Sequence, residues 1–67
     1  MANLIEGIQR ECNRVRAILP AYEELGAVGV FGLTMLKAAI TEGEAAIASG
    51  DVVRMVYAYK ALEDCKA

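Results

Sequence analysis

Three glycines spaced three residues apart, Gly26, Gly29 and Gly32, are the residues best placed to do chemistry in this sequence. They lead into an apolar segment whose start has no Ser, Thr, Asp or Asn, so a helix beginning there leaves its first backbone N–H groups without a side-chain partner. Such N–H groups and the helix dipole favour an anion, which glycines allow to approach closely. The spacing therefore predicts an anion site. The alternative is that these glycines permit a tight turn and close helix packing.

Four more residues are expected to contribute to this ligand site, from the same chain or from a neighbouring one. Lys37, Arg10 and Arg14 supply positive charge, and the ring of Tyr57 can stack on a base. A nucleotide phosphate is therefore the expected ligand, although neither the P-loop spacing nor the Rossmann fingerprint is present. Two alternatives remain: a solvated helix face for Arg10, Arg14 and Arg16, and interface packing for Tyr57.

No catalytic residue, metal ligand or cofactor is expected. The sequence has no His, so Ser49 and the two cysteines have no imidazole base to activate them. Glu23 and Glu24 are adjacent and would point about 100° apart on a helix, so they cannot share one acid–base site within a chain. Glu42 and Glu44 would also point in different directions on a helix, so they are not expected to hold a metal ion together. The chain is therefore expected to be a non-enzyme.

Apolar residues recur every three or four positions along three segments, which is the pattern of helices with a buried face. The predicted helices cover about residues 3–25, 31–49 and 51–65. Asn3 and Asp51 are suited to cap the first and third helices. Gly26 and Gly50 lie where a left-handed glycine ends a helix.

Pro20 lies inside the first helix, where it removes a backbone hydrogen bond and predicts a kink near residues 16–20. The alternative is a short separate segment that starts at Pro20. A glycine-rich hinge follows over residues 26–32, and the turn around Gly50 is so short that the helices beside it should be antiparallel or sharply angled. The expected fold is all-α: one compact three-helix domain over residues 1–67, with a kinked first, a central second and an antiparallel third helix.

The apolar surface of these helices exceeds what two neighbouring helices can cover. Ala39 and Gly43 would let another helix backbone approach closely. The second helix carries two apolar stripes: Leu33, Leu36, Ile40, Gly43 and Ile47, and Phe31, Met35, Ala38, Ala45 and Ala46. The third helix is expected to bury Val52, Met55, Val56, Tyr59 and Leu62, with Val53 and Tyr57 outside this stripe. A homodimer or higher closed oligomer, with the second helix near the symmetry axis, is therefore expected, and a monomer is the alternative.

Composition excludes several classes of protein. With 67 residues the chain forms one domain at most, and its 57% hydrophobic and 24% charged residues exclude a disordered tail. A formal net charge of −2 disfavours general nucleic-acid binding. The first residues lack the pattern of a signal peptide, and the longest nearly uncharged stretch, residues 25–36, is too short to cross a bilayer. A cytoplasmic protein is therefore expected, in which Cys12 and Cys65 act as small hydrophobic residues.

The run from Leu19 to Gly26, the pair Phe31–Gly32 and the segment from Ala48 to Val53 look like small uncharacterised helical accessory proteins of tailed phages and prophages. This resemblance covers most of the chain and implies a host-directed role in the host cytoplasm. Some such proteins block defence proteins by direct contact, and others are oligomers that sequester nucleotide immune signals. The resemblance includes no catalytic motif and assigns no functional residue.

Three functions are weighed on these grounds. The first is an oligomeric anti-defence protein that binds and sequesters an anionic ligand such as a nucleotide immune signal. The second is a protein–protein inhibitor or adaptor that blocks a host defence protein through an exposed helical face. The third is a structural phage assembly protein. We favour the first by a small margin over the second.

Overall fold

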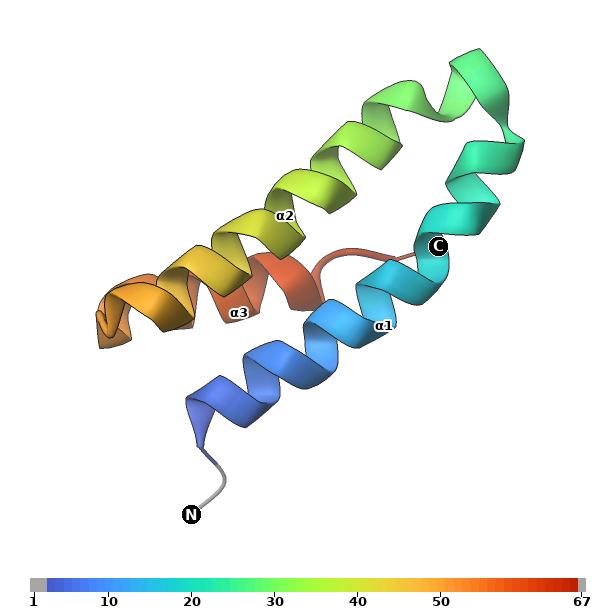
Figure 1. Cartoon of the computed structure of the whole chain (residues 1–67). Coiled ribbons are helices and arrows are strands. Elements are labelled where there is room, and N and C mark those ends of the chain that lie inside the picture. Colours follow the sequence, from blue (N-terminus) through green and yellow to red (C-terminus); the bar gives the residue numbers. More distant parts are fainter. Residues whose placement is uncertain (1–2, 67) are drawn as a thin grey trace.

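Three α-helices and one short 3₁₀ helix make up residues 3–66, the part of the chain that this computed structural model describes. They are α1 (Leu4–Glu24), η1 (Gly26–Gly29), α2 (Val30–Ser49) and α3 (Val52–Glu63), as Figure 1 shows. The expected all-α fold of three helices is confirmed. The expected hinge is itself helical, because η1 leads directly into α2, and α3 ends two residues before the predicted boundary. None of the helices in residues 3–66 has the length and apolarity needed to cross a bilayer.

The helix ends follow the capping residues in the sequence. The side chain of Asn3 accepts a hydrogen bond from the backbone N–H of Glu6 at 2.7 Å, and Asp51 accepts one from the N–H of Arg54 at 3.2 Å. Each bond satisfies one N–H group that has no partner inside its helix. Gly26 and Gly50 end α1 and α2 with positive φ angles of 60° and 71°, a conformation that favours glycine. These predicted caps are confirmed.

Helix α1 runs through Pro20 as one continuous element from Leu4 to Glu24. The alternative of a separate segment starting at Pro20 is therefore wrong. Pro20 lies on the exposed side of the helix, while the apolar side chains of Leu19 and Tyr22 stay against the other helices. The packing of this apolar side continues past the proline, which offsets the lost backbone hydrogen bond.

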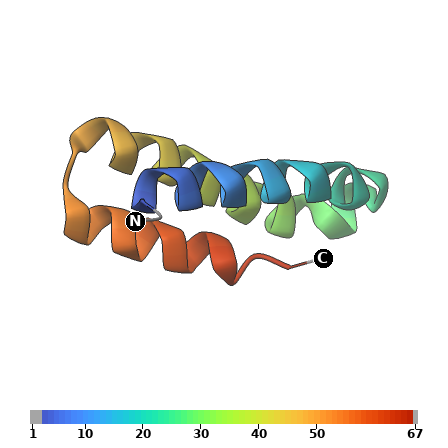
Figure 2. The ribbon, with the colours of Figure 1, turned by 90° about the horizontal axis from the view of Figure 1, so that it is seen from below.

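Helices α1 and α2 form an antiparallel hairpin, and α3 packs against both of them (Figure 1). Because α3 has only 12 residues, against 21 in α1 and 20 in α2, it covers the part of the hairpin near Gly50. The chain then runs on in an extended tail toward the η1 end, as the view from below in Figure 2 shows. The hydroxyl group of Tyr22 donates a hydrogen bond of 2.9 Å to the carbonyl of Lys66 and holds this tail. One end of the molecule thus has three helices and the other has two.

The core lies where all three helices meet. Its buried hydrophobic residues are Ile8, Cys12, Val15, Leu36, Ile40, Ala46, Met55, Ala58 and Leu62. Gly43 lies at its centre: a Cβ atom there would come within 3.0 Å of Leu62 Cδ1 and 3.2 Å of Cys12 Sγ. The small residue at position 43 thus allows close approach of α1 and α3 of the same chain, and not of a helix from a second copy as expected.

The buried face of α3 differs from the predicted one. The sequence predicts Val52 and Val56 inside, but they are 63% and 52% exposed, so this prediction is wrong. The buried residues of α3 are Met55, Ala58 and Leu62. These three lie on one line along the helix, and the small side chain of Ala58 lets α3 pack closely on the hairpin. Val52 and Val56 lie beside that line and face outward.

Candidate functional site

The three glycines of the predicted anion site have different roles in the structure. Gly26 begins η1 and has open space around it. Gly29 is buried, and a Cβ atom there would collide with the backbone carbonyl of Tyr22. A Cβ atom at Gly32 would collide with the Tyr22 ring. Two of the three glycines therefore permit close packing against Tyr22, which is the alternative interpretation of their spacing.

The start of α2 has no side-chain cap, as the sequence predicts. However, η1 comes directly before it, and the backbone N–H of Val30 donates to the carbonyl of Ala27. One of the N–H groups at this helix start is thus already occupied by the backbone. The anion site predicted here would have to use the remaining N–H groups at the η1–α2 junction.

Arg14 holds the C-terminal end of α3. Its guanidinium group donates hydrogen bonds of 2.7 Å to the carbonyl of Leu62 and 2.9 Å to the carbonyl of Cys65. It also pairs with Glu11 at 2.9 Å. Carbonyl groups at a helix end lack partners inside the helix, and a cation near them also interacts favourably with the helix dipole. Arg14 thus links α1 to the C-terminal end of α3.

The other predicted ligand-binding residues lie apart from one another. Arg10 lines a hollow of about 330 Å³ near the start of α1, together with Tyr59 of α3. Lys37 is exposed on α2, and the side chain of Tyr57 is 74% exposed on α3. The glycines lie at the opposite end of the molecule from the start of α1 (Figure 1). One chain therefore does not bring all seven predicted residues into a single site.

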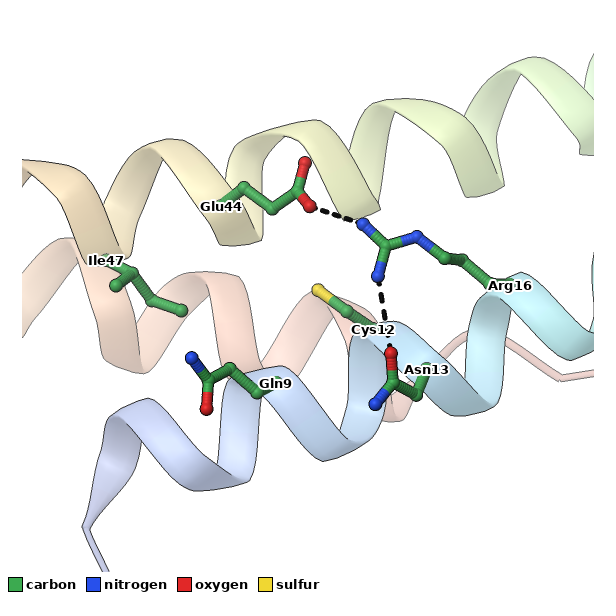
Figure 3. Close-up of a pocket in the computed structure, with 6 residues that line it drawn as sticks. All are labelled: Gln9, Cys12, Asn13, Arg16, Glu44 and Ile47. Carbon is green, nitrogen blue, oxygen red and sulfur yellow. Dashed lines mark hydrogen bonds and ion pairs between the residues drawn. The ribbon is translucent and has the colours of Figure 1, made fainter.

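A polar hollow of about 440 Å³ lies between α1 and α2 (Figure 3). It is lined by Gln9, Cys12, Asn13, Arg16, Glu44 and Ile47. Arg16 forms an ion pair with Glu44 across the helix–helix junction and donates a hydrogen bond of 3.4 Å to the side chain of Asn13. The charged groups of this hollow thus bind one another and link the two helices.

The thiol of Cys12 lies at the floor of this hollow, and only 2% of the residue is exposed. Burial raises the pKa of Cys12 above its usual value, although the charge of Arg16 acts in the opposite direction. A raised pKa keeps the thiol protonated at neutral pH, and the protonated form is a poor nucleophile. Burial also raises the pKa of Cys65, and both cysteines are free thiols. The expected role of Cys12 as a small hydrophobic residue agrees with this burial.

A second surface follows the groove between α2 and α3. Two adjoining hollows of about 370 and 600 Å³ share Ala61. We define the α2–α3 face by the apolar residues that line these hollows on the outside: Phe31, Met35, Ala39, Val53, Tyr57 and Ala61. The large side chains among them are well exposed, with values from 54% for Met35 to 77% for Phe31. The face is therefore a mainly apolar surface built from two helices, with its two hollows meeting at Ala61.

One ion pair lies on the α2–α3 face. Arg54 Nε and Nη2 donate hydrogen bonds of 2.7 and 2.9 Å to the two carboxylate oxygens of Glu42. This bidentate hydrogen bonding lowers the pKa of Glu42 below its usual value and keeps the carboxylate charged. The pair ties α2 to α3 and neutralises both charges locally.

Residues 3–66 place more large apolar side chains at the surface than inside. Ten large hydrophobic residues are exposed, whereas the core has nine hydrophobic residues, two of them alanines. Scattered apolar side chains are normal at a surface, but a contiguous apolar patch usually marks a binding site. The α2–α3 face collects four of the ten: Phe31, Met35, Val53 and Tyr57.

The acidic pairs do not form a metal site in the described residues. No group of three or more Asp, Glu, Cys or His side chains within residues 3–66 lies close enough to hold an ion. Glu42 and Glu44 face different helices, since one pairs with Arg54 and the other with Arg16. Glu23 and Glu24 are exposed in the last turn of α1.

No protein-family model, no curated protein and no solved structure matches this chain. The resemblance to phage accessory proteins therefore stays a prediction.

Proposed function

We propose that this protein is a non-enzymatic protein-binding module that recognises its partner through the α2–α3 face. The observation that carries the proposal is the group of exposed apolar side chains along α2 and α3, with Phe31 at 77% and Tyr57 at 74% exposure. Aromatic side chains are enriched among the residues that dominate the energy of protein interfaces. The second sequence-based function, an inhibitor or adaptor with an exposed helical face, is thus the one that the geometry favours.

The chemistry of the face fits a protein better than a small charged ligand. Its two hollows are lined mainly by apolar side chains, and two of the charged residues that line them, Glu42 and Arg54, already bind each other. A partner that covers this face would bury apolar side chains without leaving either charge unpaired. Interfaces of this type combine an apolar centre with satisfied polar groups at the edges.

Site-specific photo-cross-linking tests the proposal. We would replace Tyr57 with p-benzoylphenylalanine in the full chain, irradiate cells that express it, and identify the products by mass spectrometry. The matched control carries the same residue at Val52, which is 63% exposed on the same helix but lines neither hollow. We expect a defined protein adduct from position 57 and not from position 52. Equal labelling from both positions, or none from position 57, would contradict the proposal.

Nucleotide sequestration and an anti-defence role stay predictions. Their supporting feature is the uncapped start of α2, and several copies would be needed to gather the predicted cations around it. Native mass spectrometry of gently purified protein tests them, because a retained ligand adds a few hundred daltons. A Lys37→Gln variant should lose that added mass. Gly29 is unsuitable for such a test, since any side chain there would collide with Tyr22.

A further inference from the structure

We propose that the partner of the α2–α3 face is a second copy of this chain, bound in a two-fold symmetric, antiparallel dimer. This inference rests on the proposed function, because it names the protein that the face binds.

The face runs along the whole length of the molecule. Phe31 is the second residue of α2 and Val53 is the second residue of α3, and these helix starts lie at opposite ends of the bundle (Figure 1). A helix of 20 residues is about 30 Å long, so the apolar side chains extend over about that distance. A partner must therefore be an elongated body of similar length.

The side of the molecule that carries the α2–α3 face is large enough for a dimer interface. The molecule has extents of 39 × 18 × 16 Å, so this whole side has a projected area of at most about 700 Å². A standard stable interface buries about 800 Å² on each partner. A second copy has the same length and width and would cover the face from end to end. A short peptide helix of about ten residues would leave half of it exposed.

The order of side chains along the face fits a two-fold axis. The two hollows meet at Ala61, and Ala39 lies beside it on α2. Small side chains at the centre let two helix pairs approach closely. With the axis there, the Phe31 and Met35 end of one copy packs on the Val53 and Tyr57 end of the other, twice. Each aromatic side chain then covers apolar surface on the second copy.

Five charged residues line the two hollows: Glu42, Asp51 and Arg54 in one, and Asp64 and Lys66 in the other. The bidentate pair of Glu42 and Arg54 is neutral overall and would move into the interface as a unit. A formal charge of −2 on each copy causes little repulsion at physiological ionic strength.

Sedimentation analysis of purified full-length protein tests the proposal with two matched pairs of variants. The wild type is expected at about 14 kDa, twice the 7.2 kDa of one chain. Val53→Glu and Phe31→Glu should shift the protein to about 7 kDa, because symmetry places two charges in the apolar interface.

The controls Val52→Glu and Val30→Glu alter adjacent exposed residues that line neither hollow, and they should stay dimeric. Both members of each pair lie in the first turn of a helix, where an acidic residue is favoured, and circular dichroism checks that all four fold.

Several results would overturn the dimer. One is a wild-type protein that stays at about 7 kDa up to concentrations of about 100 µM. Another is equal disruption by Val52→Glu and Val53→Glu. A monomer whose position 57 cross-links to a different protein would overturn the dimer and leave the binding module intact. Absence of any cross-link from position 57 would overturn both, whereas a cross-link between two copies supports both.

Discussion

Gly43 is the glycine around which all three helices pack. It belongs to α2, yet the atoms nearest to its missing side chain come from Ile8 and Cys12 of α1 and Leu62 of α3. Contacts of 3.0 to 3.2 Å to these atoms leave space for a hydrogen atom but not for a branched side chain. Since Ile8, Cys12 and Leu62 are all buried, none can move aside without disturbing the core.

Gly43→Val is therefore expected to lower the free energy of unfolding by about 2 kcal/mol, because an overpacked core forces the helices apart. The control is Ala48→Val on the exposed side of α2, which should cost only about 0.5 kcal/mol through helix propensity. Urea unfolding followed by circular dichroism measures both. Equal effects of the two variants would contradict the central position of Gly43.

At the scale of single elements, Arg14 connects the end of α3 to α1. Arg14→Gln removes two hydrogen bonds to carbonyls and one ion pair. Because 39% of the Arg14 side chain is exposed, solvent weakens this contribution, and we expect a loss of about 1 kcal/mol. The control is Arg10→Gln, which removes the same charge one turn earlier in α1. Arg10 forms no ion pair within residues 3–66, so this variant should cost less stability. Thermal unfolding should show a lower Tm for Arg14→Gln than for Arg10→Gln.

The link between α2 and α3 should depend on pH. Bonding to Arg54 lowers the pKa of Glu42 in the folded chain, so the pair contributes stability above the pKa of the unfolded carboxyl and loses it as pH falls through the lower folded pKa. Glu42→Gln should therefore lower the Tm at pH 7, and its difference from the wild type should shrink as the pH falls below about 4.3 and vanish once the pH lies below the lowered pKa of Glu42 in the folded chain. Glu23→Gln, which removes an exposed charge from the last turn of α1, should not lower the Tm at pH 7. A difference that persists in acid would contradict this role of the pair.

The positions of the elements could be predicted from local signals. Asn3, Asp51, Gly26 and Gly50 act through contacts with residues near them in the chain, so their roles can be recognised in the sequence. The orientation of α3 could not be predicted as well. Which of its apolar lines faces inward is decided by small residues on other helices, above all Gly43, and not by the hydrophobicity of Val52 and Val56.

The candidate site was harder to predict because its contacts join distant parts of the chain. Arg16 and Glu44 are 28 positions apart, and Arg14 binds carbonyls 48 and 51 positions away. No spacing rule links such residues. The sequence did place Val53 and Tyr57 outside the main stripe of α3, and both are exposed on the α2–α3 face. It could not show that Phe31 and Met35 lie on that same face, since this follows from the packing of α3 beside α2.

At the scale of the whole molecule, the accessible surface has an ordinary area but carries many exposed apolar side chains. The accessible area is 4434 Å², while a compact protein of this mass has about 4,100 Å². If the α2–α3 face joins two copies, folding is linked to association, and stability rises with protein concentration. The Tm of the wild type should therefore increase between dilute and concentrated samples. The Val53→Glu variant should show no such increase in calorimetry.

The short third helix also divides the molecule into two ends that should open at different rates. Near the η1 end, the hairpin has no third helix, and its link to the tail includes the hydrogen bond from Tyr22 to Lys66. Backbone amides there should exchange with deuterium sooner than those around Ile8, Ile40 and Leu62, since local opening breaks fewer contacts. Any partner that covers the α2–α3 face would slow exchange most in the first turns of α2. Hydrogen exchange would therefore report when the face is occupied, whatever the partner is.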